Sequence, residues 1–130
     1  MTRTAEGFYE PGETLTPVPK VRIAVGFGPG QVLAFTAVVD TGSDVCIFPA
    51  EPFRGIPLGE PAALLQVSPF GGDSFGAPAR LPSISMGDLR ETEVASILVP
   101  GAEPLLGRSF LNRVRLELEA RQGLVRFEVV

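Results

Sequence analysis

Glycine and proline divide this chain into short apolar segments, and this division limits the folds that it can adopt. The 130 residues include 15 Gly and 13 Pro, which lie between these segments. Such residues mark turns, and short alternating segments between turns are typical of strands. A chain of this length forms one domain, and a hydrophobic content of 45% is enough for a buried core. The sequence therefore predicts an all-β domain.

Alternation of polar and apolar residues predicts the individual strands. Residues 20–25 and 31–39 lie on either side of the turn Gly26–Gly30, which predicts a hairpin. Residues 125–129 alternate clearly near the C-terminus, after a short helix expected at residues 109–113. About eight or nine short strands are expected in total, and their closure into a small barrel would remove exposed sheet edges.

Other segments give less regular patterns. Residues 1–16 are polar, contain Gly and Pro, and are expected to form an irregular N-terminal arm before a domain of residues 17–130. Residues 68–76 are rich in glycine and predict the tip of a hairpin between two apolar segments. Residues 91–99 are expected to form a single strand.

Charge and cysteine content indicate which partners and compartment to expect. The formal net charge is -4 and Lys and Arg do not cluster, which argues against nucleic acid as a partner. No apolar run is long enough to span a membrane, and the first residues contain no apolar segment typical of a signal peptide. A single Cys cannot form an internal disulfide, which fits a reducing compartment. We therefore expect a cytoplasmic protein with neither a membrane nor a nucleic-acid partner.

The absence of histidine restricts the chemistry of this chain. Without His, Ser-His-Asp and Cys-His catalysis and most zinc sites are excluded. Hydrolytic chemistry would have to come from carboxylates, Ser, Lys or a metal held by oxygen ligands. Cys46 lies in an apolar segment and is expected to be a small buried hydrophobic residue rather than a nucleophile.

One carboxylate interrupts an otherwise apolar stretch, Val38–Pro49. An apolar strand leads into Asp40, a tight turn follows at Thr41 and Gly42, and a second apolar strand leaves the turn. Aspartate is depleted in strands and is rarely buried without a partner, so this position costs stability and indicates a function. The alternative is an ordinary strand that ends in an Asp-Thr-Gly turn.

Three features occur in a particular order along the chain. They are Asp40-Thr41-Gly42-Ser43, the glycine-rich residues 68–76, and Leu105-Leu106-Gly107-Arg108. The first and third share a pattern in which an apolar strand leads to a glycine turn, which suggests a duplicated strand–turn–strand unit. The combination resembles the retropepsin-like aspartic proteases, the single-domain, retroviral-type branch of the pepsin clan. The resemblance implies a small closed β-barrel with one short helix, and neither a metal nor another cofactor.

The resemblance assigns catalysis to Asp40, Thr41 and Gly42. In this family two carboxylates share one proton, because like charges in close contact cannot both ionise, and together they direct a water molecule at a peptide bond. One chain holds one such motif and hence half a site, so the resemblance implies a homodimer with two Asp40 side chains across a two-fold axis. Thr41 would hydrogen-bond across the dimer, and Gly42 would let backbone N–H groups approach the carboxylates. The substrate would be a peptide or protein.

The resemblance also implies residues that bind substrate: Ser43, Asp44, Phe70, Gly71 and Gly72. The last three would belong to a flap, a lid that closes over an extended peptide. Arg108 would form a structural ion pair with Asp44, whereas two unrelated surface charges are the alternative. Viral flaps usually carry an apolar residue between paired glycines, and this chain has Asp73 and Ser74 at the flap tip instead.

Three functions stay open from the sequence. The first is an aspartic endopeptidase that acts as a homodimer. The second is a catalytically inactive retropepsin-like module for dimerisation or peptide binding, and the third is an unrelated small β-barrel with a ligand-binding or structural role.

The resemblance leaves two roles open for residues 125–129. Viral members of the family interleave both termini at the dimer contact. These residues could therefore form a strand of that contact, or they could be an ordinary core strand.

Overall fold

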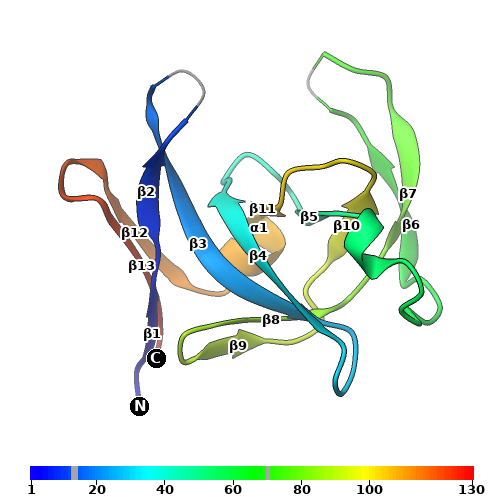
Figure 1. Ribbon diagram of the computed structural model, residues 1–130, viewed down its shortest axis with the longest axis horizontal. Helices are drawn as coiled ribbons and strands as arrows, with labels where there is room; N and C mark the ends of the chain where they lie inside the picture. The colour runs from blue at the N-terminus through cyan, green and yellow to red at the C-terminus, as the bar shows by residue number, and fades with distance from the viewer. Residues whose placement is uncertain (13–14, 70) are drawn as a thin grey trace.

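The computed structural model describes residues 1–12, 15–69 and 71–130, and their regular secondary structure is almost entirely β (Figure 1). The strands are β1 (Arg3–Glu6), β2 (Phe8–Pro11), β3 (Pro17–Gly26), β4 (Val32–Val39), β5 (Cys46–Pro49), β6 (Ala63–Val67), β7 (Phe75–Ala79), β8 (Ser83–Met86), β9 (Leu89–Glu91), β10 (Ser96–Val99), β11 (Leu105–Leu106), β12 (Arg115–Glu119) and β13 (Leu124–Val129). The helices are the 3-10 helices η1 (Glu51–Phe53) and η2 (Ala120–Gln122) and the α-helix α1 (Arg108–Leu111).

These elements confirm a mostly β fold with one short α-helix. The strands form an eight-stranded, a three-stranded and a two-stranded sheet, so there are more strands than the eight or nine expected. Closure of the strands into a barrel stays a prediction. None of the helices in the described part of the chain has the length and apolar content needed to cross a membrane.

The hairpin β3–β4 lies at the centre of the largest sheet, whose order is β10-β5-β11-β4-β3-β8-β9, with β2 paired to β3. The register of this hairpin runs from Lys20 beside Val38 to Gly26 beside Val32, which confirms the predicted hairpin. Val21, Ile23 and Val25 on β3 are each at most 3% exposed. They share one face because successive strand side chains point to opposite sides.

The short strand β11 lies between β4 and β5. It runs parallel to β4, with Leu105 beside Val38 and Leu106 beside Val39, and antiparallel to β5. A parallel neighbour requires a long connection, and here that connection includes the hairpin β6–β7. The two strand–turn units inferred from the sequence therefore lie side by side.

The N-terminal segment is more regular than expected. β1 pairs with β13 and β2 pairs with β3, so the expectation of an irregular arm over residues 1–16 is wrong for residues 3–11. Gly7 lets the chain pass from one sheet to the other, because a Cβ atom there would collide with the carbonyl oxygen of Lys20. The partner of β1 lies at the other end of the chain, so local patterns do not reveal it, whereas β2 forms a local hairpin with β3.

Residues 91–99 form parts of two strands rather than one, since β9 ends and β10 begins within this range. The guanidinium group of Arg113 donates hydrogen bonds to the carbonyl oxygens of Thr92 and Glu93, at 2.6 and 2.8 Å. Glu93 has a φ of 54°, a left-handed conformation that a continuous strand does not contain. The single strand expected here is therefore interrupted by a loop that Arg113 holds.

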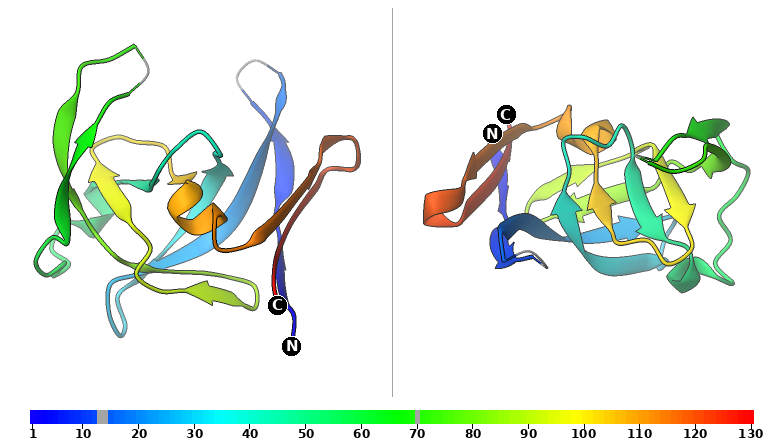
Figure 2. Two further views of the ribbon diagram at one scale, coloured as in Figure 1. Left: turned by 180° about the vertical axis from the view of Figure 1, so that it is seen from behind. Right: turned by 90° about the horizontal axis from the view of Figure 1, so that it is seen from above.

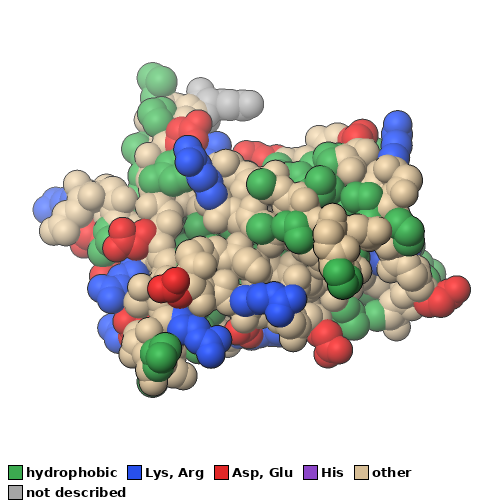
Figure 3. All heavy atoms as spheres, turned by 60° about the horizontal axis from the view of Figure 1, so that its bottom comes forward, with side chains coloured by type: hydrophobic (Ala, Val, Ile, Leu, Met, Phe, Trp, Pro, Cys, Tyr) green, Lys and Arg blue, Asp and Glu red, His purple; other side chains and the backbone are tan. Residues whose placement is uncertain are grey.

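β13 is a core strand rather than a free terminal strand. It lies between β1 and β12 in the three-stranded sheet, near both chain ends (Figure 1). Val125 and Phe127 are 0% exposed. On the outer face of this sheet Glu128 lies 3.9 Å from Arg115 and 3.5 Å from Arg126. Acidic and basic side chains are likewise interspersed on the face of the molecule drawn in Figure 3.

Candidate active site

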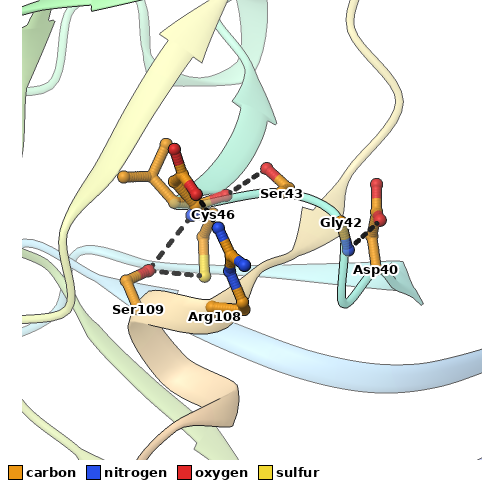
Figure 4. Close-up of polar contacts among 8 residues, drawn as sticks. Asp40, Gly42, Ser43, Cys46, Arg108 and Ser109 are labelled. Atoms are coloured by element: carbon orange, nitrogen blue, oxygen red, sulfur yellow. Dashed lines mark hydrogen bonds and ion pairs between the residues drawn. The ribbon is translucent and has the colours of Figure 1, made fainter.

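Asp40 lies where the chain leaves the end of β4. Its backbone N–H donates to the carbonyl oxygen of Leu106 at 3.0 Å, so the neighbouring strand β11 fixes its position. Its Oδ1 accepts a hydrogen bond of 2.9 Å from the backbone N–H of Gly42 (Figure 4). The side chain is half-buried, whereas Thr41 and Gly42 are exposed. The turn therefore presents a carboxylate oriented by backbone contacts.

The start of α1 holds the segment that follows this turn. The backbone N–H groups of Arg108 and Ser109 donate to the carbonyl oxygens of Ser43 and Asp44, at 2.8 and 3.1 Å. The first N–H groups of a helix have no partner within the helix, and these two find partners in the turn segment. The short helix thus fixes the backbone beyond Asp40.

Gly107 is buried beneath the same segment. A Cβ atom at this position would lie 2.6 Å from the carbonyl carbon of Val45 and 2.9 Å from the carbonyl oxygen of Ser43. Real Cβ atoms do not approach backbone atoms this closely, so only glycine permits the contact. The glycine of the Leu-Leu-Gly-Arg sequence therefore has a packing role.

Cys46 is enclosed next to Gly107 and is 0% exposed. Its Sγ accepts a hydrogen bond of 3.4 Å from the backbone N–H of Gly107, and the Oγ of Ser109 lies 3.5 Å away (Figure 4). Burial raises the pKa of the thiol above its ordinary value of 9.0, although these hydrogen bonds act in the opposite direction. Cys46 is therefore a neutral core residue, as its apolar surroundings in the sequence predict.

The structure brings Asp44 and Arg108 together. The Nη2 of Arg108 donates to the Oδ1 of Asp44, and the two side chains form an ion pair. The Asp44 side chain is 82% exposed and the Arg108 side chain 47% exposed. Water and salt screen such a pair, which contributes about 1 kcal/mol or less to folding. Its main effect is to orient the Asp44 carboxylate beside the turn.

A cleft of about 550 Å³ lies beside Asp40. The turn segment and the strand β6 both contribute to its lining. Its polar lining from the turn segment consists of Asp40, Gly42, Ser43 and Asp44. Its apolar lining includes Val45, Ile47, Leu65, Val67, Ile97 and Leu105. The cleft therefore combines a carboxylate with an apolar surface.

The glycine-rich segment connects β6 to β7, and this hairpin projects on the same side of the molecule as the Asp40 turn (Figure 1). Gly71 has a φ of 74°, and the backbone N–H of Gly72 donates to the carbonyl oxygen of Pro69. Among the described residues, neither Gly71 nor Gly72 lines the cleft, whereas Ser43 and Asp44 do. Phe70, predicted to bind substrate, lies outside the described residues.

The apolar side chains of the cleft are not among the residues singled out from the sequence. Those on β5 and just before it follow a simple alternation. Val45 and Ile47 line the cleft, whereas Cys46 and Phe48 are fully buried in the core. A period of two residues was the signal that could have identified them. The contacts of Gly107 and Ser109 have no comparable local signal.

The charged groups at the cleft limit the chemistry that a single chain can perform there. In the described ranges, no group of three or more His, Cys, Asp or Glu side chains is placed to hold a metal ion. The carboxylates that line the cleft are Asp40 and Asp44, and Asp44 is paired with Arg108. Among the described residues that line the cleft, Asp40 is therefore the carboxylate that forms no ion pair.

Comparisons with known proteins bear on the fold. No protein-family model matches the chain, and a search of curated proteins gave no significant match. Among solved structures, the chain is similar to a retropepsin-like aspartic protease from Rickettsia conorii, with a TM-score of 0.63 and 16% identity over 98% of this chain and 94% of that chain. Identity this low relates folds and does not by itself transfer an activity. The chain therefore has the fold of the retropepsin-like aspartic proteases, as its sequence motifs predicted.

Proposed function

We propose that this chain is an aspartic endopeptidase that acts as a homodimer. Asp40 of each subunit faces its mate across a two-fold axis, and the two carboxylates activate a water molecule that attacks a peptide bond. The retropepsin-like fold supports this proposal, because the Asp-Thr-Gly turn occupies the end of a strand next to a cleft.

The position of Asp40 carries the proposal. Its backbone is fixed by Leu106, its carboxylate is oriented by Gly42, and its turn is exposed at the edge of the cleft. Peptide hydrolysis by carboxylates needs one group that accepts a proton and one that donates a proton. A single subunit supplies one such group, and two-fold symmetry supplies the second, because an isologous contact places the same residue on both sides of the axis.

The two carboxylates divide the roles of base and acid. They hold one proton between them, because double ionisation at close range is unfavourable. The ionised group takes a proton from water while the water oxygen bonds to the peptide carbonyl carbon, and the protonated group gives its proton to the carbonyl oxygen. In the second step one carboxyl group gives a proton to the nitrogen and the other takes one from a hydroxyl group. The C–N bond breaks, and the pair again holds one proton.

The cleft suits an extended peptide. Among the described residues β6 has one sheet partner, β7, so its other edge can exchange backbone hydrogen bonds with a substrate strand. Apolar lining residues, including Ile47 and Leu65, would contact the substrate side chains. Binding along β6 would hold the scissile bond beside Asp40.

The test compares the full chain with its Asp40→Asn variant. Cleavage of an unfolded protein is measured from acidic to neutral pH, and the dimer is measured by sedimentation equilibrium. We expect Asp40→Asn to lower the cleavage rate by about 1,000-fold or more, since it removes the proton-transfer group. The dimer and the circular dichroism spectrum should stay unchanged, because Asn retains the oxygen that accepts from Gly42.

Asp88→Asn provides the matched control, because Asp88 is an exposed residue in the turn between β8 and β9. Its cleavage rate should equal that of the unaltered chain. Undiminished cleavage by Asp40→Asn would overturn the proposal. A dimer that binds peptides without forming products would instead support the inactive binding module, and a strict monomer would exclude the paired site.

A further inference from the structure

We propose that the hairpin β2–β3 docks each subunit onto the second copy of this chain, next to the Asp40 turn. This inference rests on the proposed homodimer and identifies a surface that would align its two halves. The hairpin consists of β2 and the first residues of β3, paired from Phe8 beside Lys20 to Pro11 beside Pro17.

The C-terminal strand β13 offers no free edge for a sheet contact across the dimer. It is paired on both edges within the subunit, by β1 and by β12. Its side chains at Val125 and Phe127 are fully buried in the subunit's own core. A partner therefore cannot pair with β13 without displacing one of these strands. A surface other than β13 must hold two Asp40 turns against each other.

The register of the central sheet places the hairpin at the same end of the sheet as Asp40. The last pair between β3 and β4 is Lys20 with Val38. From this pair, β4 continues forward to Asp40, and β3 continues back to Pro17 in the same direction. The segment of β3 that pairs with β2 therefore lies at the end of the sheet from which Asp40 leaves.

The figures show the same relation in space. The hairpin β2–β3 and the hairpin β6–β7 project from one end of the molecule, and the turn that follows β4 lies between them (Figures 1 and 2). A second copy that brings its own Asp40 to this turn approaches the same end. It must therefore contact the projecting β2–β3 hairpin or be obstructed by it.

Leu15, in the connection between β2 and β3, has features that the isolated subunit does not explain. It has a φ of 65°, a conformation that is unfavourable for a residue with a branched side chain, and it is 85% exposed. Its backbone N–H donates to the carbonyl oxygen of Gly12 at 3.0 Å, and the N–H of Gly12 donates to the carbonyl oxygen of Thr16 at 3.0 Å. These bonds hold an apolar side chain outward, where a partner can bury it.

Prolines determine how the hairpin can bind. Pro11 and Pro17 pair directly with each other, and Pro19 pairs with Tyr9, two residues farther from the connection between the strands. Proline has no backbone N–H, so this segment of β3 offers few donors for an added strand. The partner therefore contacts the side chains of the hairpin rather than adding a strand beside this segment of β3.

The test measures the dimer dissociation constant of the full chain by sedimentation equilibrium. Leu15→Asp should raise this constant by about tenfold or more, because it places a charge at a buried apolar contact. Leu15→Gly should raise it as well, and this variant relieves the positive φ rather than adding strain. Val32→Asp is the matched control, since Val32 is 58% exposed on β4 at the opposite end of the β3–β4 hairpin.

Cleavage assays separate a docking role from a catalytic one. The rate per subunit of Leu15→Asp should approach that of the unaltered chain when the protein concentration exceeds its new dissociation constant. If both Leu15 variants dimerise as tightly as Val32→Asp and still cleave, the docking inference is overturned and the proposed protease stands. A chain that is monomeric at every concentration and cleaves nothing overturns both.

Discussion

The two strand–turn units of this protein have neighbouring strands but turns with opposite surroundings. β4 leads to Asp40 and Gly42, and β11, paired with it in parallel, leads to Gly107. Gly42 is exposed beside a carboxylate, whereas Gly107 is buried beneath residues 43–45. One turn carries the group with potential chemistry, and the other supports the chain around that group.

This difference explains how Asp40 can be fixed without being enclosed. Its backbone is held by β11, and the segment beyond it is held by the first N–H groups of α1. Both supports belong to the buried unit. The carboxylate of Asp40 can therefore stay accessible, because β11 and α1 hold the backbone on either side of it. Substitutions of the two glycines should separate these roles.

Gly107→Ala should have the largest effect on folding. Its Cβ would lie 2.6 Å from the carbonyl carbon of Val45, and backbone atoms cannot rotate away as a side chain can. We expect the free energy of unfolding to fall by about 3 kcal/mol or more. Urea unfolding at one fixed protein concentration measures this change, since the stability of the proposed dimer would depend on concentration.

Gly76→Ala is a matched control for this prediction. A Cβ at Gly76 would meet the Leu64 side chain at 3.7 Å, an ordinary van der Waals contact. Its unfolding free energy should change by about 1 kcal/mol or less. A Gly107→Ala chain as stable as Gly76→Ala would show that the buried turn is not tightly packed, and the contrast between the two units would fail.

Gly42→Ala should have a smaller effect on folding and a selective effect on activity. The nearest atom to its Cβ would be the Oδ1 of Asp40, at 3.2 Å, and the position is exposed. We expect the unfolding free energy to change by about 1 kcal/mol or less. The cleavage rate should fall by about tenfold or more, because the carboxylate must shift. Urea unfolding measures the change in stability, and kcat of the same preparation measures the change in cleavage. Equal losses of stability in Gly42→Ala and Gly107→Ala would contradict the distinction between an exposed and a buried unit.

Local sequence patterns predicted the exposed unit better than the buried one. The β3–β4 hairpin and the turn at Asp40 follow from alternation and from a glycine a few residues later. The proximity of Asp44 to Arg108 came from a family resemblance, since spacing alone does not bring residues 64 positions apart together. The fit of Gly107 under Val45 depends on where α1 packs. No local pattern encodes that distance.

The N-terminal strands illustrate the same limit. Arg3 lies beside Val129 in the β1–β13 pair, so the order of residues 3–6 depends on the other end of the chain. A polar segment with Gly and Pro predicts an irregular arm when it is considered alone. Likewise, the interruption of the strand expected at residues 91–99 depends on hydrogen bonds from Arg113, which lies on another element.

Cys46 gives the smallest expected effect and tests the enclosure of the buried unit. Burial raises the pKa of its thiol above 9.0 in the folded chain. Below pH 9.0 the thiol is protonated in both states, so it adds no pH dependence. Above pH 9.0 the unfolded chain loses the proton while the folded chain retains it, and stability falls as pH rises. The slope from this group is at most about 1.4 kcal/mol per pH unit.

The free energy of unfolding is measured from about pH 8 to about pH 10 for the unaltered chain and for Cys46→Ala. The difference between the two chains isolates the contribution of the thiol, because every other titrating group is common to both. Cys46→Ala should be less stable at neutral pH, because it removes buried atoms, but its stability should decline less steeply above pH 9.0. Native protein should also react slowly with a thiol reagent that modifies the unfolded chain at once. Identical slopes in the two chains, together with rapid native labelling, would mean that the turn beneath Asp40 opens to solvent as readily as the turn that carries it.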